Sequence, residues 1–217
     1  MAALQHLYSH ACTAADSLNG RPFSSPSIVC HLRRRQSIVV AQAGTAASKA
    51  PAQQAKSKLS QLAGRKYGHN LTDNQKQEVR GVIKELESMQ SGDMRKQQLS
   101  GSNWQLLYTE STGSSGGKVG PFVGQVNQVF PANQPGIYIN KLQLGPIRAD
   151  LSANYKFSAS DKIDVNFVDI AAYLGPLRLV QKDFGGRGGF WKLSYSDDDL
   201  RILYTNQGNV FVLKRAS

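Results

Sequence analysis

Residues 147–157 read IRADLSANYKF, and their side chains alternate between apolar and polar along the whole stretch. The apolar positions are Ile147, Ala149, Leu151, Ala153, Tyr155 and Phe157. Because successive side chains of a β-strand point to opposite faces of the sheet, this alternation predicts a strand with one buried face and one solvated face. Ala149 and Ala153 stand among larger residues, so we expect them to leave part of the buried face unfilled.

The same period-two pattern continues on both sides of this stretch, from Leu99 towards the C-terminus. Its pieces run over residues 104–109, 119–130, 136–144, 162–170, 177–182, 190–195, 199–205 and 209–213. Turn-forming residues separate the pieces, as in PANQPG at 131–136 and GGRGG at 185–189. Short antiparallel strands of this kind, about nine in number, predict a sandwich or a barrel. The single apolar face of each strand favours a barrel whose interior can hold one small ligand.

Helical patterns precede the strands. Thr72 and Gln75 have the spacing of a capping box, and the helix that they begin is expected to stop by Gly92. Its apolar residues recur at helical intervals at Val79, Val82, Ile83, Leu86 and Met89. Residues 51–71 are expected to form a linker with a short helix over residues 55–66. The helix and the barrel together make the predicted domain, residues 72–217.

The first fifty residues differ in composition from the rest. They contain five basic residues, among them Arg33, Arg34 and Arg35, against the single acid Asp16, and they are rich in Ser and Ala. This composition is typical of an organelle transit peptide, which we predict for residues 1–50. Both cysteines of the chain lie in this segment, so the remainder is expected to have no disulfide and no thiolate metal site.

Charge and hydropathy limit the partners. The formal net charge of the whole chain is +11, but residues 97–217 carry twelve basic and nine acidic side chains that are scattered singly. Nucleic-acid binding needs clustered basic residues with aromatics between them, so no nucleic-acid partner is predicted. A mild basic excess suits anionic lipid headgroups better. No apolar run approaches the roughly 18–20 residues of a membrane-spanning helix.

Candidate catalytic groups are few. His69 is the only histidine after residue 50 and precedes the helix, where a loop role is favoured over acid–base chemistry. Asp150, Asp164 and Asp169 fall in the polar register of predicted strands, which favours solvated carboxylates over a catalytic pair. The DDD at 197–199 lacks the spacing of a calcium loop, and GSSGGK at 113–118 lacks that of a phosphate loop. We therefore predict no cofactor, no metal and no catalytic residue.

Several motifs resemble the plastid-lipid-associated protein (fibrillin) family. They are LSGSNWQLLYT at 99–109, GP at 120–121, GQV at 124–126, VNF at 165–167, WKLSYSDDDLRI at 191–202 and GNVFVL at 208–213. The resemblance covers roughly residues 58–215 and implies a lipocalin-like antiparallel β-barrel preceded by one or two N-terminal α-helices. It also implies a chloroplast location, in the stroma or at a plastoglobule or thylakoid surface, and a carrier or organiser of lipids without agreed catalytic residues.

On this basis we expect a non-enzymatic protein that binds a lipid or isoprenoid-like apolar ligand and associates peripherally with a membrane or plastoglobule surface. The residues expected to line the lumen are Leu106, Tyr108, Val126, Ala149, Leu151, Ala153, Tyr155, Val165 and Phe167. Trp104 and Arg201 are expected to meet at one end of the barrel. Two alternatives stay open: a filled barrel that acts as a protein-interaction scaffold, and an isomerase-type enzyme with a buried carboxylate in the lumen.

A fluorescent protein fused behind residues 1–50 is expected to enter chloroplasts and to lose the segment on import, because basic, acid-poor leaders are read by organelle import machinery. Confocal microscopy and N-terminal sequencing of the imported fusion check this. A fusion that remains in the cytosol, or that still begins with Met1, would contradict the prediction.

Overall fold

The computed structural model describes residues 46–96 and 99–216. The chain divides into two units, Met1–Ala41 and Gln42–Ser217, and all described residues belong to the second. The predicted transit peptide lies outside the described residues, except for its last five positions.

Two helices precede a β-rich body, which confirms the predicted fold class. The helices are α1 (Ala46–Ala63) and α2 (Asp73–Ser88), followed by the short 3₁₀ turns η1 (Met94–Lys96) and η2 (Ser114–Gly116). The strands are β1 (Ser102–Thr109), β2 (Lys118–Val119), β3 (Phe122–Val123), β4 (Gln125–Phe130), β5 (Ile137–Leu144), β6 (Ile147–Phe157), β7 (Lys162–Leu174), β8 (Leu177–Asp183), β9 (Gly188–Ser196), β10 (Leu200–Thr205) and β11 (Val210–Arg215).

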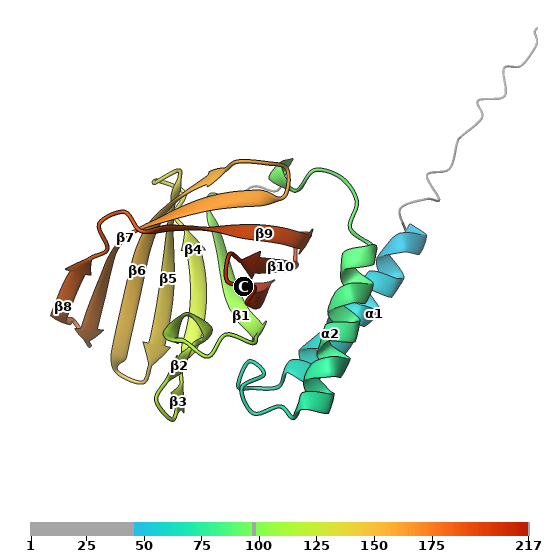
Figure 1. The fold of residues 1–217 in the computed structure, drawn as a ribbon, viewed down its shortest axis with the longest axis horizontal. Coiled ribbons are helices and arrows are strands. Elements are labelled where there is room, and N and C mark those ends of the chain that lie inside the picture. The colour runs from blue at the N-terminus through green and yellow to red at the C-terminus, as the bar shows by residue number, and fades with distance from the viewer. Residues whose placement is uncertain (1–45, 97–98, 217) are drawn as a thin grey trace, which may run out of the picture. The chain divides into compact units, whose positions relative to one another are not determined.

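The large sheet curls into a ring. Within the described residues it has nine strands in the order β6-β5-β4-β1-β11-β10-β9-β7-β8, and an additional β6–β7 pairing joins the two sides. β7 pairs with β6 along its length, with β9 through residues 162–166 and with β8 through residues 169–174. Figure 1 shows the strands wrapped around an interior, with β8 at the side away from the helices.

Apolar residues gather in two clusters, one on each face of the sheet. The inner cluster fills much of the ring and includes Trp104, Phe130 and Leu203. The outer cluster joins the two helices to the outer face of β1, β10 and β11 and includes Leu59, Ile83 and Val212 (Figure 1). Strands β10 and β11 therefore bury side chains on both faces, whereas every residue of β8 is exposed.

Helix α2 has the predicted start. The Thr72 side chain accepts a hydrogen bond from the Gln75 backbone amide, and the Gln75 side chain accepts one from the Thr72 amide, so the capping box is confirmed. Val79, Val82, Ile83 and Leu86 are buried, as the helical spacing indicates.

Helix α1 is longer than the short helix predicted over residues 55–66 and covers much of the expected linker. Its stripe is made of small residues, since Ala55 and Ala63 flank Leu59 at helical spacing and all three are buried. Alanine is the best helix former but contributes little to an apolar pattern. Lys56 also forms an ion pair with Asp197 in the β9–β10 turn, which anchors α1 to the barrel.

Candidate functional site

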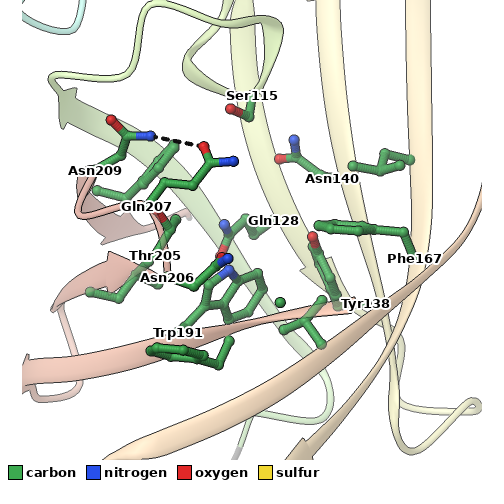
Figure 2. A pocket seen from close by; sticks show the side chains of 16 residues that line it. Ser115, Gln128, Tyr138, Asn140, Phe167, Trp191, Thr205, Asn206, Gln207 and Asn209 are labelled. Atoms are coloured by element: carbon green, nitrogen blue, oxygen red, sulfur yellow. Dashed lines mark hydrogen bonds between the residues drawn. The ribbon is translucent and has the colours of Figure 1, made fainter. Parts of the chain in front are cut away.

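The ring of strands surrounds a partly open cavity of about 160 Å³. Its walls come from β4, β5, β6, β7, β9, β10 and β11, and the turn after β10 and the η2 loop border it. Figure 2 shows Tyr138, Asn140 and Phe167 on one side and Trp191, Thr205 and the Asn206–Asn209 turn on the other. The cavity therefore draws on nearly the whole circumference of the barrel.

Aromatic side chains form much of the wall. The rings of Tyr138 and Trp191 meet edge to face with centroids 4.7 Å apart, and Phe167 and Phe190 also line the space. Burial raises the pKa of the Tyr138 hydroxyl above its ordinary value, so this phenol stays neutral at physiological pH. An apolar ligand with a flat surface suits such walls.

Three polar side chains in the cavity have buried oxygens without a hydrogen-bond partner in the described structure. They are Gln128 Oε1, Asn140 Oδ1 and Thr205 Oγ1. Gln128 and Asn140 are cross-strand neighbours in the β4–β5 register, with 6% and 9% of their surfaces exposed. Buried polar groups are normally paired, and an unpaired one costs about 1–3 kcal/mol. It is unusual that three such unpaired oxygens line the same cavity.

A loop at the border of the cavity is held in place by a histidine. His69 Nε2 lies 2.7 Å from the carbonyl oxygen of Gly116, which follows the cavity residue Ser115. A side chain at Gly116 would collide with the backbone oxygen of Ser111, because a Cβ there would lie 2.7 Å from it. The GSSGGK stretch is therefore a tethered loop, and His69 has a structural contact in place of the acid–base role considered for it.

The nine residues expected in the lumen lie in different places. Leu151, Val165 and Phe167 line the cavity. Leu106, Val126 and Ala153 are buried in the inner cluster, and Tyr155 packs on that cluster with its ring 5.1 Å from Phe130. Ala149 lines a smaller neighbouring cavity of about 70 Å³ that also contacts Leu151.

Tyr108 lies on the outer face, in the cluster beneath the helices. The register of β1 against β11 shifts between Leu106 and Tyr108. An extra residue in a strand reverses the alternation beyond it, so Leu106 faces inward while Leu107 and Tyr108 both belong to the outer cluster. The Tyr108 hydroxyl donates a hydrogen bond to Glu110 at 2.9 Å.

Sequence reasoning missed the polar members of the cavity, although a signal for them exists. Gln128 stands in the same register as Val126 and Phe130, and Asn140 stands between Tyr138 and Leu142 in the same way. In both strands an amide side chain interrupts a row of apolar residues on the inner face, and this pattern could have identified Gln128 and Asn140 from the sequence. Such a position either packs poorly or meets a polar group.

Trp104 and Arg201 meet inside the barrel. The Arg201 guanidinium carbon lies 4.1 Å from the Trp104 ring centroid and 5.4 Å from that of Phe130. The Arg201 side chain is fully buried, and its three guanidinium nitrogens have no hydrogen-bond partner among the described residues. Burial, followed by the charge of Arg215, lowers the pKa of Arg201 to about 9.

The aspartates considered as catalytic groups lie outside the lumen. Asp150 alternates with the cavity residues of β6 and lies 3.1 Å from Arg148 Nε. Asp164 is 3.7 Å from Lys162 Nζ, and Asp169 accepts a hydrogen bond from the Gln181 side chain at 2.7 Å. Within residues 46–96 and 99–216, no cluster of three or more His, Cys, Asp or Glu side chains suits a metal ion.

The fold and cavity together define a closed antiparallel barrel with a small, largely apolar lumen. The PAP_fibrillin family model matches residues 53–184, more than half of the chain, from α1 to the end of β8. The chain therefore belongs to the PAP_fibrillin family, and this membership supports a lipid-associated role in plastids. Members of the family are generally structural or lipid-associated and not catalytic. Searches of curated proteins and of solved structures found no match.

Replacing Arg201 with Met is expected to change the free energy of unfolding by less than about 1 kcal/mol. The variant loses cation–π contacts worth about 0.5–2 kcal/mol each, but it also removes an unpaired buried charge whose desolvation costs several kcal/mol. Arg201→Ala is expected to lose about 2–5 kcal/mol, because it leaves a cavity. Urea unfolding of the two variants measures both values. A Met variant as unstable as the Ala variant would show that the charge itself stabilises the barrel.

Proposed function

We propose that this protein binds a lipid or another apolar small molecule in the lumen of its barrel, without catalysing a reaction. The observation that carries the proposal is the cavity of about 160 Å³ inside the ring of strands, beside a smaller space of about 70 Å³ that shares Asn140 and Leu151 with it. Protein interiors are close-packed, so a space of this size is rare in a domain that only needs to fold. Membership of a lipid-associated plastid family points to the same class of ligand.

The two other functions considered for this chain fit the cavity less well. A filled barrel acting as a scaffold would place bulky side chains in this space. An isomerase would need an acid or base facing the ligand. The described residues that line the cavity include no Asp, Glu or His, and the aspartates of β6 and β7 contact partners outside it.

The outer surface offers a place for contact with a lipid surface. Apolar side chains are exposed at the tip formed by the β7–β8 turn and the adjoining end of β6, which we call the β7–β8 tip. Its members are Ile147, Leu174, Leu177, Leu179 and Val180, each between 45% and 62% exposed. Exposed apolar patches of this kind mark interaction sites.

Basic side chains flank the β7–β8 tip. Arg148 lies over the Tyr173 ring at 4.3 Å, and Arg178 pairs with Tyr173 across the β7–β8 ladder. Lys182 follows on β8 and is exposed. Apolar residues beside cations complement an anionic lipid surface, so we propose that this tip docks on a plastoglobule or thylakoid surface. In the part of the chain that the structure describes, no helix is long and apolar enough to cross a membrane.

Val165→Phe in the full-length chain is expected to abolish co-purification of apolar molecules, because Val165 is buried in the cavity wall and a larger side chain fills the space. The matched control is Val168→Phe on the same strand, where the side chain is 45% exposed. Mass spectrometry of organic extracts compares wild type and both variants. An unchanged lipid profile in the Val165 variant would end the carrier proposal.

Thermal melts of the same variants identify the alternative. If the barrel is a filled scaffold, the extra ring at position 165 overpacks the core and costs about 1–3 kcal/mol of stability. In that case neither wild type nor the variants co-purify with a ligand.

The double variant Leu177→Asp/Leu179→Asp is expected to bind vesicles that contain anionic lipid at least about tenfold more weakly than wild type. Each leucine contributes about 1.5–3 kcal/mol when it is fully buried, and 1.4 kcal/mol is a factor of ten. Vesicle co-sedimentation at low and high salt measures the change. The control is Val119→Asp, an exposed apolar position on β2. Equal binding by wild type and the double variant would place the membrane contact elsewhere.

A further inference from the structure

We infer that the ligand of the lumen carries a neutral, hydroxyl-bearing head of about the size of one six-membered ring, held by Gln128, Asn140 and Thr205. This inference rests on the proposed ligand-binding function and specifies the chemical class of the ligand. Figure 2 shows Gln128 near the middle of the site, between Thr205 and Asn140.

The amides of Gln128 and Asn140 form a polar patch on one wall. They are direct cross-strand partners in an antiparallel pair, so their Cβ atoms are about 4.5–5.5 Å apart and their side chains share a face. Both are buried, yet each amide oxygen has no partner among the described residues. Two adjacent buried amide oxygens without a hydrogen-bond donor are costly, and a ligand that donates a hydrogen bond to them removes this cost.

Thr205 adds a third unpaired oxygen from another strand. Its Oγ1 is buried in the same cavity wall, one residue before the bordering turn. A hydroxyl both donates and accepts, so it satisfies an amide whichever way the oxygen and nitrogen are turned, and it satisfies a threonine hydroxyl as well. A ketone only accepts, and a hydrocarbon does neither. The three groups therefore favour a hydroxyl.

The electrostatics of the lining favour a neutral head. The described residues around the cavity include five carboxamides but no Lys, Arg or His, and no Asp or Glu. Arg201 is a cation buried inside the barrel, but its guanidinium stacks on Trp104 and Phe130 and is not part of the lining. Burying a carboxylate or phosphate without a partner is strongly unfavourable. The lining therefore disfavours fatty acids and phospholipid headgroups.

The size of the cavity sets the size of the head. An apolar cavity of about 150 Å³ holds one benzene molecule, and this one measures about 160 Å³. The edge-to-face pair of Tyr138 and Trp191 offers flat aromatic contacts to such a ring. The cavity has no room for a long lipid tail beside such a ring, so the tail extends beyond it, past the bordering loops or into the smaller neighbouring cavity that shares Asn140 and Leu151.

The test compares three molecules of one shape with the full-length protein: 4-pentylphenol, pentylbenzene and 4-pentylbenzoate. All three have a pentyl chain on a benzene ring. The phenol carries a neutral hydroxyl opposite the chain, pentylbenzene carries no polar group, and the benzoate carries an anionic carboxylate. Isothermal titration calorimetry is expected to show the phenol binding about tenfold more tightly than pentylbenzene, as one or two net hydrogen bonds provide. The benzoate is expected to bind more weakly than both.

The variants Asn140→Leu and Thr205→Val test whether these two side chains cause the preference for the phenol over pentylbenzene. Each is expected to reduce the phenol-to-pentylbenzene ratio several-fold while leaving pentylbenzene binding in place, a result that a loss of folding would not give. The matched control is Asn127→Leu, next to Gln128 on β4, where the side chain hydrogen-bonds to Asn103 on the outer face. This control is expected to keep the wild-type ratio.

The outcomes separate the inference from the function on which it rests. If phenol and pentylbenzene bind equally, or the benzoate binds best, the lumen is a ligand site but the hydroxyl-bearing neutral head is wrong. A ratio that is unchanged in the Asn140 and Thr205 variants also overturns the assignment. If none of the three molecules binds to wild type, both the inference and the carrier function fail.

Discussion

The pairing of β6 with β7 is the constraint on which the rest of the barrel depends. These two long strands pair from Ile147 opposite Leu174 to Phe157 opposite Ile163, and this ladder joins the two ends of the sheet into a ring. Without it, the sheet would be open between β6 and β7, and its interior would be exposed to solvent. The shift in register between Ser152 and Ala153 bends the pair at its middle, where bulges increase local twist. Leu151 reaches the same cavity as Val165 and Phe167 because of this closure.

Burial is distributed unevenly around this ring. One side of the barrel stabilises the fold, and the opposite side carries the exposed surface proposed for function. On the side of β1, β10 and β11, both faces are covered, because α1 and α2 bury Leu59, Ile83 and their neighbours against the outer face. This double layer supplies the apolar burial that stabilises small domains. On the opposite side, β8 packs against no helix within the described residues and is exposed throughout. The doubly covered side can therefore stabilise a barrel that also contains an unfilled lumen and an exposed β7–β8 tip.

The fold was largely predictable from sequence because it depends on periodicity, whereas the site was less so. Period two predicted the strands, and capping-box spacing predicted α2. Helix α1 was underestimated, because its stripe consists of alanines around Leu59. Alternation alone cannot locate a bulge, so Tyr108 was expected on the wrong face of β1. The unpaired state of Gln128 and Asn140 depends on which strands become neighbours, and a sequence pattern within one strand does not contain that information.

Two kinds of polar group occupy the barrel interior, and their different surroundings explain why only one is available to a ligand. Arg201 carries a charge, yet Trp104 and Phe130 cover its guanidinium, and it contributes nothing to the cavity lining. The cation is thereby kept from acting as an anion site, although its nitrogens are unpaired. Gln128, Asn140 and Thr205 are neutral and open to the cavity. In a medium of low dielectric, an exposed guanidinium would dominate recognition. Because aromatic rings cover the Arg201 guanidinium, the ligand is selected by its shape and by hydrogen bonds to the neutral side chains of the cavity.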